Sequence, residues 1–130
     1  MKPYKLKLND GGRNLSRRPY QINDCVVRAL AIACRVKYDD VYDKLKRAGR
    51  KSHQGFDLDE WLGVSPVCTL QRTFTKVNKK GLTVNNFVSR HSKGTFLIMN
   101  HHHVWVVIDG VHHDMIRVKD QPLASIWRVR

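Results

Sequence analysis

Cysteine is scarce in this chain, which argues against two common uses of thiols. The 130 residues include three cysteines, Cys25, Cys34 and Cys68, and no two of them form a Cys-x-x-Cys pair. An odd and low count does not fit a secreted disulfide framework, and the spacing does not fit a thiolate zinc site. We therefore expect reduced thiols.

Long apolar runs are also missing. The longest run spans Ala29 to Cys34, whereas a membrane-spanning helix needs roughly 20 apolar residues. The start of the chain, Met1 to Lys5, lacks the apolar segment of a signal peptide. We expect a cytoplasmic protein that does not associate with membranes, with one domain large enough to bury its own core.

Acidic residues are few relative to basic ones. The sequence has 24 Lys and Arg residues against 11 Asp and Glu, a formal net charge of +13. Such an excess suggests a polyanionic or acidic partner. The basic residues are scattered along the chain, however, and no nucleic-acid-binding motif accompanies them, so a solvated basic surface is an equal alternative.

The order of expected elements is helices first and strands last. Residues 1–20, with two prolines and a Gly-Gly pair, are predicted to be an extended or loosely ordered basic arm, followed by a single domain over residues 21–130. Asp24 is the expected N-cap of a central helix that is apolar on nearly every face. Further helices are predicted over residues 38–48, around 58–62, and after Thr83 as N-cap. The segments GTFLIMN, HVWVVIDG and VHHDMIRV are predicted strands, which makes the fold class α+β.

Cys25 stands at the start of the central helix. Unpaired backbone N–H groups and the positive end of the helix dipole favour a thiolate at that position. Cys34, nine residues later, points to the opposite side of the helix. The local sequence leaves two interpretations open, a buried structural cysteine, which is the commoner fate of a free thiol, and a nucleophile.

A nucleophilic cysteine needs a base and a group that orients the base. His103 opens a predicted strand, where its side chain can reach a cleft. Asp109 and Asp114 are the acidic candidates. Asp109 would lie about 20 Å away along the same strand, whereas a hairpin brings Asp114 back beside His103. The alternative is a zinc site built from residues 101–103 and 112–113, but neighbouring strand residues face opposite sides and no metal motif is present, so we expect no metal or other cofactor.

Three stretches carry a resemblance to a known superfamily. They are NDCVVRALAIAC followed by YDDVYDKL, the segment AGRKSHQG, and HSKGTFLIMNHHHVWVVIDGVHHD, which together cover about residues 22–115. In this order they resemble the papain-like cysteine peptidases, especially the compact C39-like branch and related small phage and bacterial proteins. The resemblance implies a papain-like fold in which a buried N-terminal helix carries the cysteine and packs on a C-terminal antiparallel sheet.

The resemblance also implies roles for individual residues. Cys25 would be the nucleophile, His103 the general base and Asp114 the orienting acid, with His102 as the alternative base. Papain-like enzymes usually place a Gln six residues before the cysteine, where this chain has Pro19; Gln21 is therefore the expected side-chain donor of the oxyanion hole, and Asn23 the second choice.

The expected function is that of a small cysteine hydrolase, a peptidase or an isopeptidase or amidase, acting on a protein or peptide that is acidic. If the chain is phage-encoded, it would act in the host cytoplasm. The alternative is a noncatalytic basic protein that uses the same fold to bind nucleic acid or a host protein.

Overall fold

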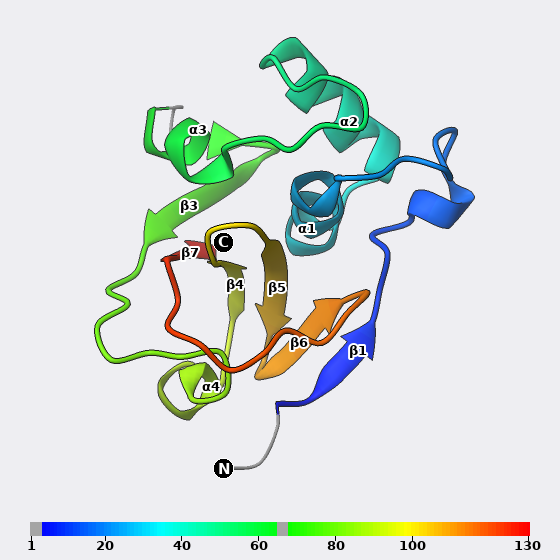
Figure 1. Ribbon diagram of the computed structural model, residues 1–130. Coiled ribbons are helices and arrows are strands. Elements are labelled where there is room, and N and C mark those ends of the chain that lie inside the picture. The colour runs from blue at the N-terminus through cyan, green and yellow to red at the C-terminus, as the bar shows by residue number, and fades with distance from the viewer. Residues whose placement is uncertain (1–3, 65–67) are drawn as a thin grey trace.

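The computed structural model describes residues 4–64 and 68–130 (Figure 1), so the first three residues of the predicted arm lie outside the described part. The elements in chain order are β1 (Leu6–Leu8), the 3-10 helix η1 (Arg13–Leu15), α1 (Cys25–Cys34), α2 (Tyr38–Arg47), α3 (Leu58–Val64), β2 (Cys68–Thr69), β3 (Arg72–Lys76), α4 (Phe87–Arg90), β4 (Thr95–Met99), β5 (Val104–Ile108), β6 (Val111–Asp114) and β7 (Ser125–Val129). The predicted α+β class is confirmed. Among the described residues, no helix combines the length and apolar character needed to cross a membrane.

One seven-stranded sheet organises the molecule. Its strand order is β1-β6-β5-β4-β7-β3-β2, and every pairing is antiparallel except that of β1 with β6. Helices α1, α2 and α3 contribute to a hydrophobic core on one face of the sheet. The short helix α4 and the loops around it cover a second core on the other face. The sheet therefore separates a helical layer from a layer made mostly of loops.

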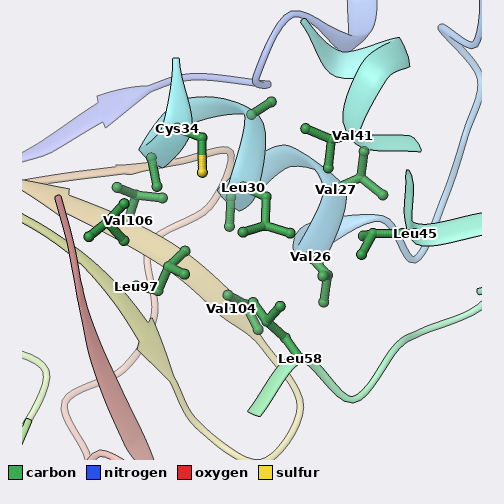
Figure 2. Close-up of a cluster of buried hydrophobic side chains, with 14 of the residues drawn as sticks. Val26, Val27, Leu30, Cys34, Val41, Leu45, Leu58, Leu97, Val104 and Val106 are labelled. Atoms are coloured by element: carbon green, nitrogen blue, oxygen red, sulfur yellow. The ribbon is translucent and has the colours of Figure 1, made fainter. Parts of the chain in front are cut away.

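The central helix α1 lies where its composition predicts. It packs against α2, β5 and β4, and Figure 2 shows its apolar side chains meeting those of α2, α3 and the strands. Val27 and Leu30 are fully buried, because a helix without a polar face has to be covered on all sides.

Asp24 stands at the predicted N-cap position, but the prediction that its side chain caps α1 is wrong. Asp24 occupies the N-cap position of α1, but its carboxylate makes no capping hydrogen bond. The carboxylate is 1% exposed and instead binds the side chains of Arg13, Arg28 and Tyr38. A carboxylate buried this deeply is satisfied by cations and a hydroxyl group rather than by helix amides.

Helices α2 and α3 confirm the predictions for residues 38–48 and 58–62. The helix predicted after Thr83 is shorter, since α4 covers only Phe87–Arg90. The Thr83 N–H donates to Asn86 Oδ1 at 2.6 Å, and the Val84 N–H donates to the Gln121 carbonyl at 3.0 Å. These bonds tie residues 83–86 into a turn beside the loop after β6 and delay the start of the helix.

The predicted arm is part of the sheet. Strand β1 pairs in parallel with β6, matching Leu6 with His112, and the ring of Tyr4 stacks on that of His112 at 4.0 Å between centroids. The first part of the predicted arm is therefore held by β6, and residues 13–18 are held by ion pairs with Asp24 before α1 and with Asp39 and Asp43 in α2. Neither this pairing nor the strands β2, β3 and β7 were predicted, whereas β4, β5 and β6 match the three predicted strands, the last ending at Asp114.

Candidate active site

Cys25 meets His103 where the start of α1 crosses the start of β5. The Cys25 thiol lies beside the His103 ring and the backbone N–H of Val104, close enough for both to lower its pKa against the effect of burial. Cys25 is half-buried, and it lines an open cleft of about 560 Å³. A partly exposed thiol beside an imidazole is the arrangement that nucleophilic cysteine chemistry needs.

The opposite side of the His103 ring binds Asp114. His103 Nε2 lies 2.5 Å from Asp114 Oδ2, because the β5–β6 hairpin returns the end of β6 to the start of β5. The Nδ1 atom is thus left for the thiol. Asp109, the other acidic candidate, lies at the far end of the hairpin and accepts the Gly94 N–H at 2.8 Å. The structure therefore brings together the three predicted residues, Cys25, His103 and Asp114.

Asp114 is itself held by two further donors. Its Oδ1 atom accepts the Met115 N–H at 2.7 Å and lies 3.4 Å from Arg28 Nη1. Asp114 is 4% exposed, so these bonds are shielded from water and restrict the carboxylate to one orientation. An oriented carboxylate fixes in turn the tautomer and the direction of the imidazole.

Arg28 connects Asp114 to Asp24. Arg28 Nε lies 3.2 Å from Asp24 Oδ1, and Asp24 also accepts hydrogen bonds from Arg13 Nη1 at 3.1 Å and from the Tyr38 hydroxyl at 2.7 Å. A charged network therefore runs from the N-terminal segment to the acid beside His103. This role of Arg28 was not predicted; its one signal in the sequence is a lone cation inside an apolar helix.

The electrostatics favour a thiolate–imidazolium pair. Burial alone would raise the pKa of Cys25, but the hydrogen bonds from His103 and Val104 and the charges of His103 and Arg28 lower it overall. Burial likewise opposes protonation of His103, yet the hydrogen bonds to Asp114 and Cys25 and their charges raise its pKa to about 9. Both shifts favour the charged pair, a thiolate beside an imidazolium, over the neutral pair.

Cys34 shows the opposite behaviour. It is 1% exposed in the core, and burial raises its pKa to about 11 with only a small opposing effect of Arg72. The thiol is therefore unreactive at neutral pH. The predicted placement of the two thiols, with Cys25 in a cleft and Cys34 packed on the other side of α1, is confirmed. The side chain of Cys68 is not among those that the structure describes.

Three segments besides α1 form the walls of the cleft. They are residues 55–59 with the start of α3, residues 99–104 at the β4–β5 turn, and residues 124–125 at the start of β7. His102 lines the cleft but is exposed. Among the described residues, His103 is the imidazole that lies beside Cys25 and binds a carboxylate.

A second hydrogen-bonded group supports the cleft wall. Asp59 Oδ1 accepts hydrogen bonds from Ser125 Oγ at 2.5 Å and from Trp127 Nε1 at 2.8 Å, and Lys76 Nζ lies 3.2 Å away. These bonds link α3 to β7 beside the cleft. This group was not predicted, since nothing in the local pattern relates residue 59 to residue 125.

The two candidate oxyanion donors, Gln21 and Asn23, contact a neighbouring loop. Gln21 Nε2 donates to Ser52 Oγ at 3.3 Å, and Gln21 Oε1 accepts the His53 N–H at 2.6 Å. Asn23 Nδ2 donates to the His53 carbonyl at 2.9 Å. Neither residue lines the cleft, whereas Cys25 and Val26 do. The backbone amides in the first turn of α1 lack helical acceptors, so they are better placed as donors, and the roles of Gln21 and Asn23 stay predictions.

No arrangement of three or more His, Cys, Asp or Glu side chains suited to a metal ion occurs within residues 4–64 and 68–130. Comparisons of the chain with protein-family models, with curated proteins and with solved structures find no match. The contacts of Cys25 with His103, and of His103 with Asp114, therefore carry the functional argument.

Proposed function

We propose that this chain is a small cysteine hydrolase of the papain-like class, acting on an amide bond in a protein or peptide. The observation that carries the proposal is the continuous set of contacts from the Cys25 thiol through the His103 ring to the Asp114 carboxylate. The order of nucleophile, base and acid along the chain, on an α+β fold with the cysteine at the start of a buried helix, supports the papain-like assignment and the kinship with C39-like phage and bacterial proteins.

The geometry supports a two-step mechanism. The Cys25 thiolate attacks the carbonyl carbon, and His103 gives its proton to the departing amine, which leaves an acyl group on the sulfur. His103, now neutral, takes a proton from water, which attacks the thioester and frees the thiolate. Asp114 keeps the imidazole directed at the thiol throughout. Backbone N–H groups of the first turn of α1 stabilise the negative oxygen of each tetrahedral intermediate.

The proposal requires no cofactor. The cleft is open and has walls from three separate segments, so it can admit part of a protein or peptide chain. The excess of basic residues over the whole chain favours an acidic protein as substrate or partner.

Selective labelling of Cys25 tests the proposal. The protein is treated at neutral pH with a limiting amount of an iodoacetamide or acyl-ester probe, and the modified residue is identified by mass spectrometry. We expect labelling at Cys25 and none at Cys34, and we expect His103→Ala to reduce the rate at Cys25 by at least about tenfold. Turnover of an acyl-ester probe by the wild type, but not by Cys25→Ser, would establish hydrolysis.

Two results would contradict the proposal. One is a Cys25 thiol that reacts no faster than free cysteine; the other is a rate that is unchanged in His103→Ala while the fold is retained. Either would favour the noncatalytic alternative, in which the same scaffold only binds a partner.

A further inference from the structure

The positive charge of the protein is distributed unevenly between the two layers. Residues 21–64, which form the helical layer with Cys25, contain eight basic and seven acidic residues. That layer is close to neutral. Most of the excess charge therefore lies elsewhere, and much of it lies on the opposite side of the sheet.

Seven cations gather in the layer around α4, and we call this surface the basic face. Its residues are Lys79, Lys80, Arg90, Lys93, Arg117, Lys119 and Arg128. The first six are exposed, and Arg128 is half-buried with its guanidinium 5.6 Å from the centre of the Phe96 ring. Figure 1 shows α4 and the loop after β6 on the side of the sheet away from α1 and α2.

Backbone contacts hold the two segments of the basic face side by side. The Leu123 N–H donates to the Leu82 carbonyl at 3.2 Å, and an isolated bridge pairs Thr83 with Pro122. Arg90 Nη1 also lies 3.5 Å from the Lys80 carbonyl. The cations of residues 79–93 and 117–119 therefore belong to one surface of fixed geometry.

The acidic residues near the basic face are already engaged with backbone amides. The Asp120 carboxylate accepts the Asn85 N–H at 3.0 Å, and the Asp109 carboxylate accepts the Gly94 N–H at 2.8 Å. Among the described residues, no Lys or Arg of the basic face has a carboxylate within 4.0 Å. The basic side chains that do are Arg13, Arg17, Arg18, Arg28 and Lys76.

Two cations of the basic face also act on His91, although burial has the larger effect on its pKa. Burial, and then the charges of Arg128 and Arg90, lower the pKa of His91, which follows α4. A face on which cations outnumber carboxylates concentrates mobile anions and attracts polyanions from solution.

The side chains between the cations of the basic face favour a nucleic acid over a membrane as its polyanionic partner. The exposed side chains between its cations are short and polar, such as Asn78, Ser89 and Ser92, and these hydrogen-bond well to phosphate and sugar oxygens. The large exposed apolar side chains nearby, Met115 and Ile116, directly follow β6, and residues 77–93 expose none. A membrane-binding surface would carry apolar side chains among its cations.

We propose that the basic face binds the phosphate backbone of a nucleic acid without reading its sequence. The contact would lie on the face of the sheet opposite Cys25, so bound nucleic acid leaves the cleft open. This function goes beyond hydrolysis and does not depend on it, because it uses neither Cys25 nor His103.

Binding of fluorescein-labelled DNA of about 30 nucleotides, single-stranded and duplex, tests the proposal by fluorescence anisotropy between about 50 and 200 mM salt. The test variant is Lys79→Glu/Lys80→Glu. The matched control is Lys46→Glu/Lys51→Glu, which changes the net charge equally at exposed positions of the helical layer. Thermal melting confirms that both variants fold, and labelling of Cys25 is measured in parallel.

We expect wild-type binding to weaken steeply with salt. Lys79→Glu/Lys80→Glu should weaken binding by at least about tenfold and reduce the slope of log affinity against log salt by about two, one for each lost phosphate contact. The control should change affinity by less than about threefold, and neither variant should slow the labelling of Cys25. Preference for single or double strands identifies the form bound.

Three results would overturn the proposal. The first is no binding at the lowest salt. The second is equal weakening by the two variants, which would show that net charge and not the basic face is responsible. The third is binding to vesicles containing phosphatidylserine without binding to DNA, which would assign the face to a membrane. Each of these leaves the hydrolase proposal standing, because that proposal is judged by Cys25 labelling.

Discussion

Arg28 Nη1 lies 3.4 Å from Asp114 Oδ1, and the same guanidinium reaches Asp24 through Nε at 3.2 Å. Arg28 follows Cys25 by three residues on α1, so it lies on the same side of the helix one turn later. The residue therefore holds the acid of the proposed triad from the element that carries the nucleophile. Helix α1 therefore carries the nucleophile and also binds the acid, which the β5–β6 hairpin supplies.

Replacing Arg28 by Met should shift the reactivity of Cys25 to higher pH. The positive charge of Arg28 normally lowers the pKa of Cys25, so the pKa of the thiol should rise when that charge is lost. The rate of alkylation by iodoacetamide, measured against pH, should therefore increase at higher pH than in the wild type. Arg35→Met removes the same charge at the exposed end of α1 and should leave the profile in place. An unmoved profile in folded Arg28→Met would show that Arg28 only stabilises the fold.

Replacing Asp114 by Asn should lower the pKa of His103 from about 9 toward its ordinary value. A neutral amide can keep a hydrogen bond to the ring, but it cannot stabilise the imidazolium as the carboxylate does. NMR titration of the histidine rings measures the change directly. Asp109→Asn, at the far end of the hairpin, is the control and should leave the His103 titration unchanged. A His103 pKa that stays near 9 in Asp114→Asn would contradict the assignment of Asp114.

His112 should make the protein sensitive to acid. It is fully buried, accepts a hydrogen bond from Trp105 Nε1 at 2.8 Å, and burial lowers its pKa to about 4. In the unfolded chain the pKa is about 6.5, so the unfolded state takes up a proton first as the pH falls. The stability conferred by a neutral His112 is therefore present above pH 6.5 and lost between about pH 6.5 and 4.

This loss amounts to about 2 kcal/mol of unfolding free energy between pH 7 and pH 5. Urea denaturation of the wild type and of His112→Gln at both pH values measures it. Glutamine can accept the Trp105 hydrogen bond but does not titrate, so its unfolding free energy should fall by about 2 kcal/mol less than that of the wild type. An equal fall in both proteins would assign the acid sensitivity to other groups.

Gly11 should tolerate no side chain, because the N-terminal segment passes directly over α1. A Cβ at Gly11 would lie 2.8 Å from the Arg28 carbonyl oxygen, and the φ angle is +68°. Gly12→Ala is a matched control, since Gly12 also has a positive φ of +88° but no atom within 4 Å of a Cβ. Both variants lose stability to backbone strain, about 1 kcal/mol.

Gly11→Ala should lose at least a further ~1 kcal/mol from the close contact. It should also slow the labelling of Cys25, since the displaced segment carries Arg13 and with it one partner of Asp24. Urea denaturation and labelling rates compare the two variants. Equal unfolding free energies and equal labelling rates in Gly11→Ala and Gly12→Ala would contradict this prediction.

The sequence predicts those parts of the fold that depend on local patterns. Three such patterns correspond to observed elements. They are the apolar run after Asp24, the helical spacing of residues 38–48, and the change from helical to strand-like spacing after residue 94. The pairing of β1 with β6 and the position of β7 between β4 and β3 depend on contacts between distant segments, which no local pattern encodes.

The candidate site, like the fold, can be predicted from the sequence only in part. Cys25, His103 and Asp114 follow from helix-end chemistry, hairpin geometry and the resemblance to papain-like enzymes. The partners of Asp24 and Arg28 do not, because the carboxylate that a buried arginine meets is decided by tertiary packing. Likewise, the capping rule for Asp24 fails where burial and nearby cations compete for the same carboxylate.

The parallel pairing of β1 with β6 gives the molecule a late step in its assembly. Asn9 contacts His113 across 104 residues of sequence, and the Asn9 N–H donates to the Asp114 carbonyl at 3.0 Å. During synthesis the first strand has no partner until almost the whole chain has been made, and closing so large a loop is slow. Helix α1, which carries Cys25, can fold early. Asp114 reaches its final place only when the last strands form. A truncated or unfinished chain would therefore carry Cys25 without the pair of His103 and Asp114 that activates it.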